Sequence, residues 1–114
     1  MKEVDIIQLL ELLVERTKSE KIEWESLPNG KDRLILLNGS ILFEYIFDAM
    51  DEQFDYKISL YDNTKVFASY EVSDCMTEED FQLHDLMNQL RIEIKEVREK
   101  AVRVKIASLY DELL

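Results

Sequence analysis

Two residues carry side chains suited to nucleophilic or acid–base chemistry, Cys75 and His84. A thiol becomes a nucleophile when a helix N-terminus or a neighbouring base favours the thiolate, and histidine is the usual base. Cys75 lies just before a predicted helix, but the acidic residues around it oppose ionisation of the thiol. Nothing in the spacing of Cys75 and His84 specifies a catalytic pair. We therefore expect an inert thiol, a structural histidine and no catalytic residue.

Motifs for binding phosphates or metals are missing from the sequence. The two glycines, Gly30 and Gly39, both lie in turn contexts, so the chain has no glycine-rich phosphate loop. The acidic run from Asp48 to Glu52 lacks the glycine that a regular calcium loop requires. No cysteine and histidine spacing fits zinc. We expect no cofactor, no bound metal and no enzyme activity.

Negative charge is concentrated in the middle of the chain. The chain has 25 acidic and 14 basic residues, a net charge of −11, and residues 34–85 alone hold twelve acids and two bases. A strongly negative surface repels phosphates, so we expect neither direct nucleic-acid binding nor binding to an anionic membrane. The acids fit either a solubilising surface or a face that docks on a basic protein surface.

Candidate partner-binding residues form two acidic clusters and an aromatic pair. The two aromatic residues are predicted to face away from the core, where exposed rings commonly anchor interfaces. The candidates are Asp48, Asp51, Glu52 and Asp55; Asp74, Glu78, Glu79 and Asp80; and Tyr61 and Phe67.

The periodicity of apolar residues predicts the elements that position these candidates. Apolar residues at helical spacing, from Ile6 to Val14, predict a helix over residues 4–20. Alternation then predicts a series of strands joined by turns at 27–30, Asn38-Gly39 and 62–65. Consecutive strands with short turns form an antiparallel meander, here of four or five strands. The predicted strands are residues 21–26, 33–37, 40–47, 54–61 and 66–72.

A long helix is predicted to follow the strands. Thr77 can cap it, and neither glycine nor proline interrupts it from Glu78 to about Glu112, a length of about 50 Å. One apolar stripe keeps the four–three spacing of a coiled-coil seam. A second stripe opens on another face near the C-terminus, so the helix either bends or breaks around Lys100 or docks its end on a second chain. The first stripe is Leu83, Met87, Leu90, Ile94, Val97, Ala101 and Val104; the second is Val102, Ile106, Leu109 and Leu113.

Together these patterns predict a single α+β domain over residues 1–114, with two helices packed on one face of the sheet. A single cysteine fits a reducing compartment, and the N-terminus lacks the basic region of a signal peptide, so we expect a cytoplasmic protein. Its expected function is a non-catalytic protein-interaction module with a basic protein partner. A homo-oligomer assembled through the long helix, such as a homodimer, is one alternative, and a small enzyme or small-molecule binder is another.

Short motifs flank the predicted strands. Lys21-Ile22-Glu23-Trp24 and Leu27-Pro28-Asn29-Gly30 follow the first helix, and the strand from Tyr56 to Tyr61 leads into Asp62-Asn63-Thr64-Lys65. In this order the chain resembles small uncharacterised bacterial and phage α+β proteins, which implies an origin in a bacterium or mobile element. In size and charge alone it is similar to small acidic phage inhibitors, including DNA-mimicking anti-CRISPR proteins. An inhibitor or immunity-type protein is thus one expected form of the interaction module.

Overall fold

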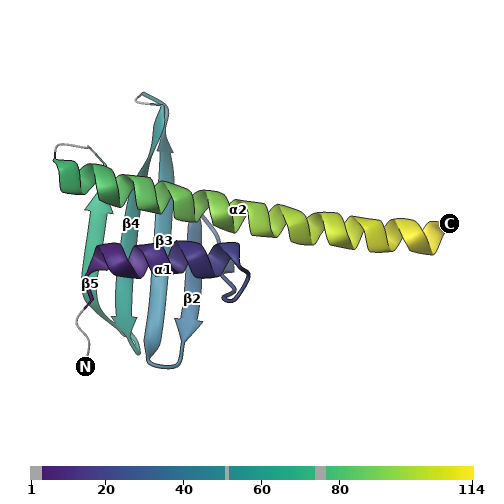
Figure 1. The fold of residues 1–114 in the computed structure, drawn as a ribbon, viewed down its shortest axis with the longest axis horizontal. Helices are drawn as coiled ribbons and strands as arrows, with labels where there is room; N and C mark the ends of the chain where they lie inside the picture. The colour runs from purple at the N-terminus through teal and green to yellow at the C-terminus, as the bar shows by residue number, and fades with distance from the viewer. Residues whose placement is uncertain (1–3, 51, 74–76) are drawn as a thin grey trace.

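The computed structural model describes residues 4–50, 52–73 and 77–114 and has the predicted α+β architecture (Figure 1). Five strands form one antiparallel sheet in the order β1-β2-β3-β4-β5, which confirms the meander. A helix precedes the sheet and a much longer one follows it. The elements are α1 (Ile6–Lys18), β1 (Glu25–Leu27), β2 (Lys31–Leu36), β3 (Gly39–Asp48), β4 (Gln53–Asp62), β5 (Lys65–Val72) and α2 (Glu78–Leu113).

Both helices cross the strands on the same face of the sheet and lie side by side (Figure 1). Alternation along β4 explains this packing, because Tyr56 and Ile58 are buried towards the helices while Asp55 and Lys57 point to the other face. Within the described residues that other face of the sheet is uncovered. The core between the layers includes Leu10, Leu13, Phe43, Ile58, Met87 and Leu90.

The first strand is shorter than predicted. Only Glu25–Leu27 pairs with β2, and the alternation of residues 21–24 does not produce a strand. Trp24 instead packs into the core, where its indole Nε1 donates a hydrogen bond to Thr17 Oγ1 at 2.9 Å. The tertiary contact of one large side chain therefore overrides the local period.

Two of the three predicted turns form as expected and one differs. In the turn at residues 62–65, Asp62 pairs with Lys65 and Asn63 takes positive φ. Asn29 and Gly30 both take positive φ, as the predicted turn requires. The next turn is formed by Leu37 and Asn38 rather than by Asn38 and Gly39, because Gly39 already pairs with Leu36 at the start of β3. A Cβ atom at Gly39 would overlap the backbone carbonyl oxygen of Tyr61 on β4, so close approach of the strands explains the glycine.

Helix α2 is continuous over 36 residues, which excludes the bend or break near Lys100. Its calculated length of about 54 Å matches the 55 Å long dimension of the molecule. Every residue from 101 to 114 is exposed, and this segment, here called the arm, projects past the sheet (Figure 1). The arm raises the radius of gyration to 16.1 Å, against about 13 Å for a compact domain of this length.

Among the described residues, the helices lack an apolar stretch of the length needed to cross a membrane.

Candidate functional site

Of the two residues considered first for chemistry, the structure describes His84. His84 is half-buried; its Nε2 lies 3.1 Å from the backbone carbonyl oxygen of Phe54 and its ring packs edge-on against Tyr56. This arrangement fastens the start of α2 to β4, as expected of a structural histidine. Cys75 lies outside the described residues.

Carboxylates do not gather into a metal-binding cluster within the described ranges 4–50, 52–73 and 77–114. On the uncovered face, acidic and basic side chains instead alternate across four neighbouring strands in the order Lys31, Glu44, Lys57 and Glu71. Lys31 Nζ lies 3.2 Å from Glu44 Oε1, and Lys57 Nζ lies 3.4 Å from Glu71 Oε1. The four charges in this row therefore form two ion pairs, Lys31 with Glu44 and Lys57 with Glu71.

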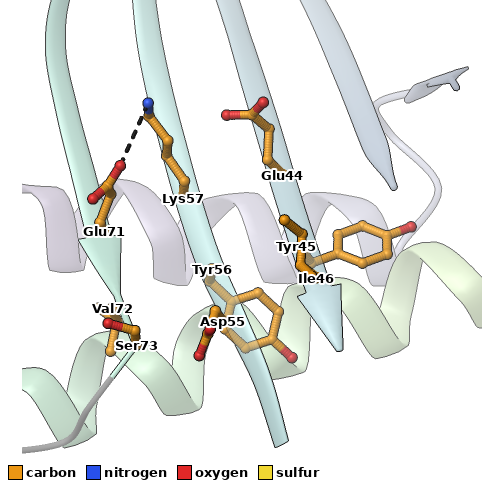
Figure 2. Close-up of a pocket in the computed structure, with 9 residues that line it drawn as sticks. All are labelled: Glu44, Tyr45, Ile46, Asp55, Tyr56, Lys57, Glu71, Val72 and Ser73. Carbon is orange, nitrogen blue, oxygen red and sulfur yellow. Dashed lines mark ion pairs between the residues drawn. The ribbon is translucent and has the colours of Figure 1, made fainter. Parts of the chain in front are cut away.

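Figure 2 shows the depression beside this charged row, with Glu44, Lys57 and Glu71 projecting from adjacent strands. Its volume is about 400 Å³, enough for a small ligand. Its charged groups are partly exposed and Lys57 is already paired with Glu71. The depression therefore offers a solvated surface that carries three carboxylates, of Glu44, Asp55 and Glu71, and one ammonium group, of Lys57.

The two acidic clusters lie at the same end of the sheet. His84 contacts the carbonyl of Phe54 at the start of β4, and Gln53 Nε2 donates to the Ser73 carbonyl oxygen at 3.4 Å. The β3–β4 hairpin and the first turns of α2 are therefore neighbours. Of the predicted acids, this end carries Asp48, Glu52, Asp55, Glu78, Glu79 and Asp80, whereas Asp51 and Asp74 lie outside the described residues.

Local structure accounts for some of these acids. Thr77 Oγ1 accepts a hydrogen bond from Asp80 N at 3.1 Å, and Asp80 Oδ2 accepts one from Thr77 N at 3.2 Å, which makes a capping box. Glu78 and Glu79 complement the positive end of the α2 dipole. Asp48 Oδ1 accepts from Met50 N at 3.0 Å in the hairpin.

Tyr61 and Phe67 lie at the opposite end of the sheet from the acids. Both lie beside the β4–β5 turn, where a register shift interrupts the pairing of the two strands, and Phe67 is 66% exposed. Tyr61 lies six positions along β4 from Asp55, a distance of about 20 Å. The ten sequence-predicted residues therefore do not form one surface.

A buried polar network holds α2 at the point where it leaves the sheet. Asp32 on β2 is completely buried and accepts hydrogen bonds from Arg98 Nη2 and, at 3.2 Å, from the Tyr45 hydroxyl. Arg98 Nη2 also donates to the Trp24 carbonyl oxygen at 3.4 Å. Burial, and then the Asp32 carboxylate, raise the pKa of Tyr45 above 10.0. The network ties β2, β3 and α2 together at the root of the arm.

A second network fastens the earlier part of α2 to β4. The Tyr56 hydroxyl donates to Asn88 Oδ1 at 2.7 Å and accepts from Arg91 Nε at 2.9 Å. The Arg91 guanidinium also lies 4.0 Å from the centre of the Phe54 ring. Burial raises the pKa of Tyr56, while the positive charge of Arg91 opposes this rise.

Among the residues that the structure describes, none makes a comparable hydrogen bond or ion pair with the arm. The last ion pair of α2 within the described residues joins Lys100 Nζ to Glu20 Oε2 at 2.9 Å. Beyond it, the second apolar stripe is exposed on every turn, and Leu109 is 61% exposed. The members of this stripe are Val102, Ile106, Leu109 and Leu113. The spacing of these residues predicted the stripe, but the stripe was not included among the candidate partner-binding residues.

The stripe continues the side of α2 that meets the sheet. Ile106 follows Asn88, and Leu109 follows Arg91, by 18 residues, which is five turns of an α-helix. Asn88 and Arg91 contact Tyr56 on β4, whereas the arm has no sheet beneath the same side. Within the described residues, the arm is therefore the longest part of α2 whose apolar side packs against no other element.

Comparison with protein-family models, with curated proteins and with solved structures finds no match for this chain.

Proposed function

We propose that the protein is a non-catalytic interaction module that binds another protein chain through the arm. The observation that carries the proposal is the exposure of Val102, Ile106, Leu109 and Leu113 along one side of a continuous helix. Exposed apolar stripes of this kind are the contact surface in helix-in-groove and helix–helix recognition.

The structure around the arm supports this proposal. A helix whose apolar side meets only water gains no packing energy, and short isolated helices are marginally stable. The arm extends a helix already fixed by Arg98 and by the buried residues Leu90 and Ile94. The helical conformation is thus prepared before a partner binds, which lowers the entropy lost on binding.

A photo-crosslinking amino acid placed at Leu109 tests the proposal. Asn63, in the exposed β4–β5 turn, is the matched control position. We expect the Leu109 variant to form adducts, either with itself or with a second protein, in purified protein or in lysate of the source cells. The Asn63 variant should form far fewer. Equal labelling at both positions, or no adduct at Leu109, would overturn the proposal.

The acidic end is a second candidate surface, favoured because the described acids of both clusters lie at the same end of the sheet. It fits an inhibitor or immunity-type protein that docks on a basic protein surface in the cytoplasm of a bacterium or phage-infected cell. Pull-down at low and at high salt tests it. A partner retained at low salt and lost at high salt supports this surface, whereas a salt-insensitive partner or none contradicts it.

A further inference from the structure

The geometry of the arm points to a second copy of this chain as its partner, in an antiparallel helix pair. In this pair Val102 faces Leu113 of the second copy and Ile106 faces Leu109. The inference rests on the proposed function, because it names the chain that the arm binds.

The spacing of the stripe is the first argument for the antiparallel arrangement. The intervals from Val102 to Ile106, Leu109 and Leu113 are four, three and four residues, a series that is the same from either end. A two-fold axis between positions 107 and 108 therefore brings every member of the stripe against another member. Such pairs pack knobs into holes along a coiled-coil seam.

Charge is the second argument. The same register places Lys105 beside Glu112 of the second copy, and Arg103 beside the Tyr110 ring, each twice by symmetry. The basic root of the arm thereby lies along the acidic tip of its partner. A parallel, in-register pair would instead place the basic residues Arg103 and Lys105 of both copies at the same level, and likewise the acidic residues Asp111 and Glu112, which is repulsive.

The position of the folded domains is the third argument. In the antiparallel register Val102 and Leu113 lie at the two ends of the contact, so the overlap takes in the whole exposed stripe. The two folded domains then lie at opposite ends of the pair and do not compete for space. A parallel pair would bring both domains to the same end.

The size of this contact predicts a modest affinity. Four apolar side chains from each chain bury less than the 1,200 Å² or so of a small specific interface, although the helices are already formed. We expect a dissociation constant of about 10–100 μM. The assembly is therefore a dimer only at high protein concentration.

Sedimentation equilibrium of the purified full chain, from about 5 to about 500 μM, tests the dimer. We expect the average mass to rise towards twice the monomer mass. Leu109→Glu, which puts a charge against Ile106, should keep the protein monomeric over this range. Ser108→Glu adds the same charge beside the stripe and should still dimerise. A strict monomer at every concentration overturns the inference.

Charge exchange tests the register. Lys105→Glu and Glu112→Lys should each weaken dimerisation by about tenfold, because each creates like-charge pairs. The double variant restores opposite charges and should restore dimerisation. Weakening that is simply additive in the double variant overturns the antiparallel register.

Disulfide trapping tests the direction. In a Cys75→Ser background, Ile106→Cys and Leu109→Cys proteins are mixed and oxidised. The antiparallel pair yields the mixed disulfide, whereas a parallel pair yields two homodisulfides and contradicts the inference. If the purified protein stays monomeric while Leu109 crosslinks to another protein in lysate, self-pairing fails and the proposed function stands. If Leu109 crosslinks to nothing, both fail.

Discussion

The two parts of α2 have the same conformation but opposite environments. They are residues 78–100, here called the docked half, and the arm. In the docked half, Leu83, Met87, Leu90 and Ile94 are buried against the sheet and α1. The arm carries as many large apolar residues on one side, yet all of them are exposed. The reason is the width of the sheet, since five strands about 4.8 Å apart span only about 20 Å beneath a helix of about 54 Å. Apolar spacing identifies the side of a helix that can pack, and the dimensions of the neighbouring layer decide how much of it does.

The same side of the helix also changes character along its length. Asn88 and Arg91 are polar where the helix meets Tyr56, and Ile106 and Leu109 are apolar five turns later. Where the sheet supplies polar partners, the helix presents polar groups to them. Where the sheet ends, the helix presents side chains that suit another apolar surface.

The largest expected difference between the halves concerns arginines. Arg98→Met leaves Asp32 buried without its cation, and we expect the free energy of unfolding to fall by about 3–5 kcal/mol. Arg103→Met, one and a half turns further along in the arm, should change it by less than about 0.5 kcal/mol. Urea unfolding at low protein concentration measures both. Similar losses for the two variants would show that the halves are not energetically distinct.

Two leucines give the next largest contrast. Leu90→Ala opens a cavity in the core, since Leu90 is fully buried, and should lower the free energy of unfolding by about 2–5 kcal/mol. Leu109→Ala removes the same atoms from an exposed position and should change it by less than about 0.5 kcal/mol in the monomer. Above the dimer dissociation constant the Leu109 effect should grow with concentration. A loss at Leu109 that is large and independent of concentration would contradict this comparison.

Much of the fold could be predicted because its signals are local. The alternation of Phe54, Tyr56, Ile58 and Leu60 identified β4 and its buried side, and the asparagine–glycine turn required positive φ. The contact of Trp24 with Thr17 on α1 was not predicted. The alternation of Trp24 with its neighbours is typical of a strand and does not indicate a contact with a helix.

The candidate site was less predictable because it depends on distant contacts. No local pattern indicates that Asp32 pairs with Arg98, 66 residues further along the chain. Nor does such a pattern separate Tyr61 from Asp55, since both fit the same exposed side of one strand and only their distance along it keeps them apart. The second stripe was visible, but its significance depends on where the sheet ends.

Alkaline pH should weaken the buried network of Tyr45, Asp32 and Arg98 that holds the docked half of α2 on the sheet. Burial raises the pKa of Tyr45 above 10.0, and Asp32 raises it further. Because the folded state then binds the proton more tightly, the unfolded state ionises first as pH rises. The contribution of Tyr45 to the free energy of unfolding is therefore fully present below about pH 10. It is lost as pH rises from there through the folded-state pKa of Tyr45.

Tyr45→Phe removes this contribution. Its free energy of unfolding should fall less steeply than that of the unsubstituted protein between about pH 10 and pH 11.5. Tyr110→Phe, on the exposed arm, is the control and should keep the original slope. Urea unfolding across this pH range gives the slopes. Identical slopes for the Tyr45→Phe variant and the unsubstituted protein would show that Tyr45 does not contribute to this pH dependence.

The smallest expected effect lies at the boundary between the halves, in the ion pair of Lys100 with Glu20. Both side chains are about half exposed, so the pair should contribute about 0.2–1 kcal/mol at low salt and less at high salt. A double-mutant cycle with Lys100→Gln and Glu20→Gln isolates this coupling from the effects of each substitution alone. A coupling above about 2 kcal/mol, unchanged by salt, would mean that tertiary stabilisation extends into the arm. The docked half would then end beyond Lys100, and fewer residues would be free to pair with a second chain.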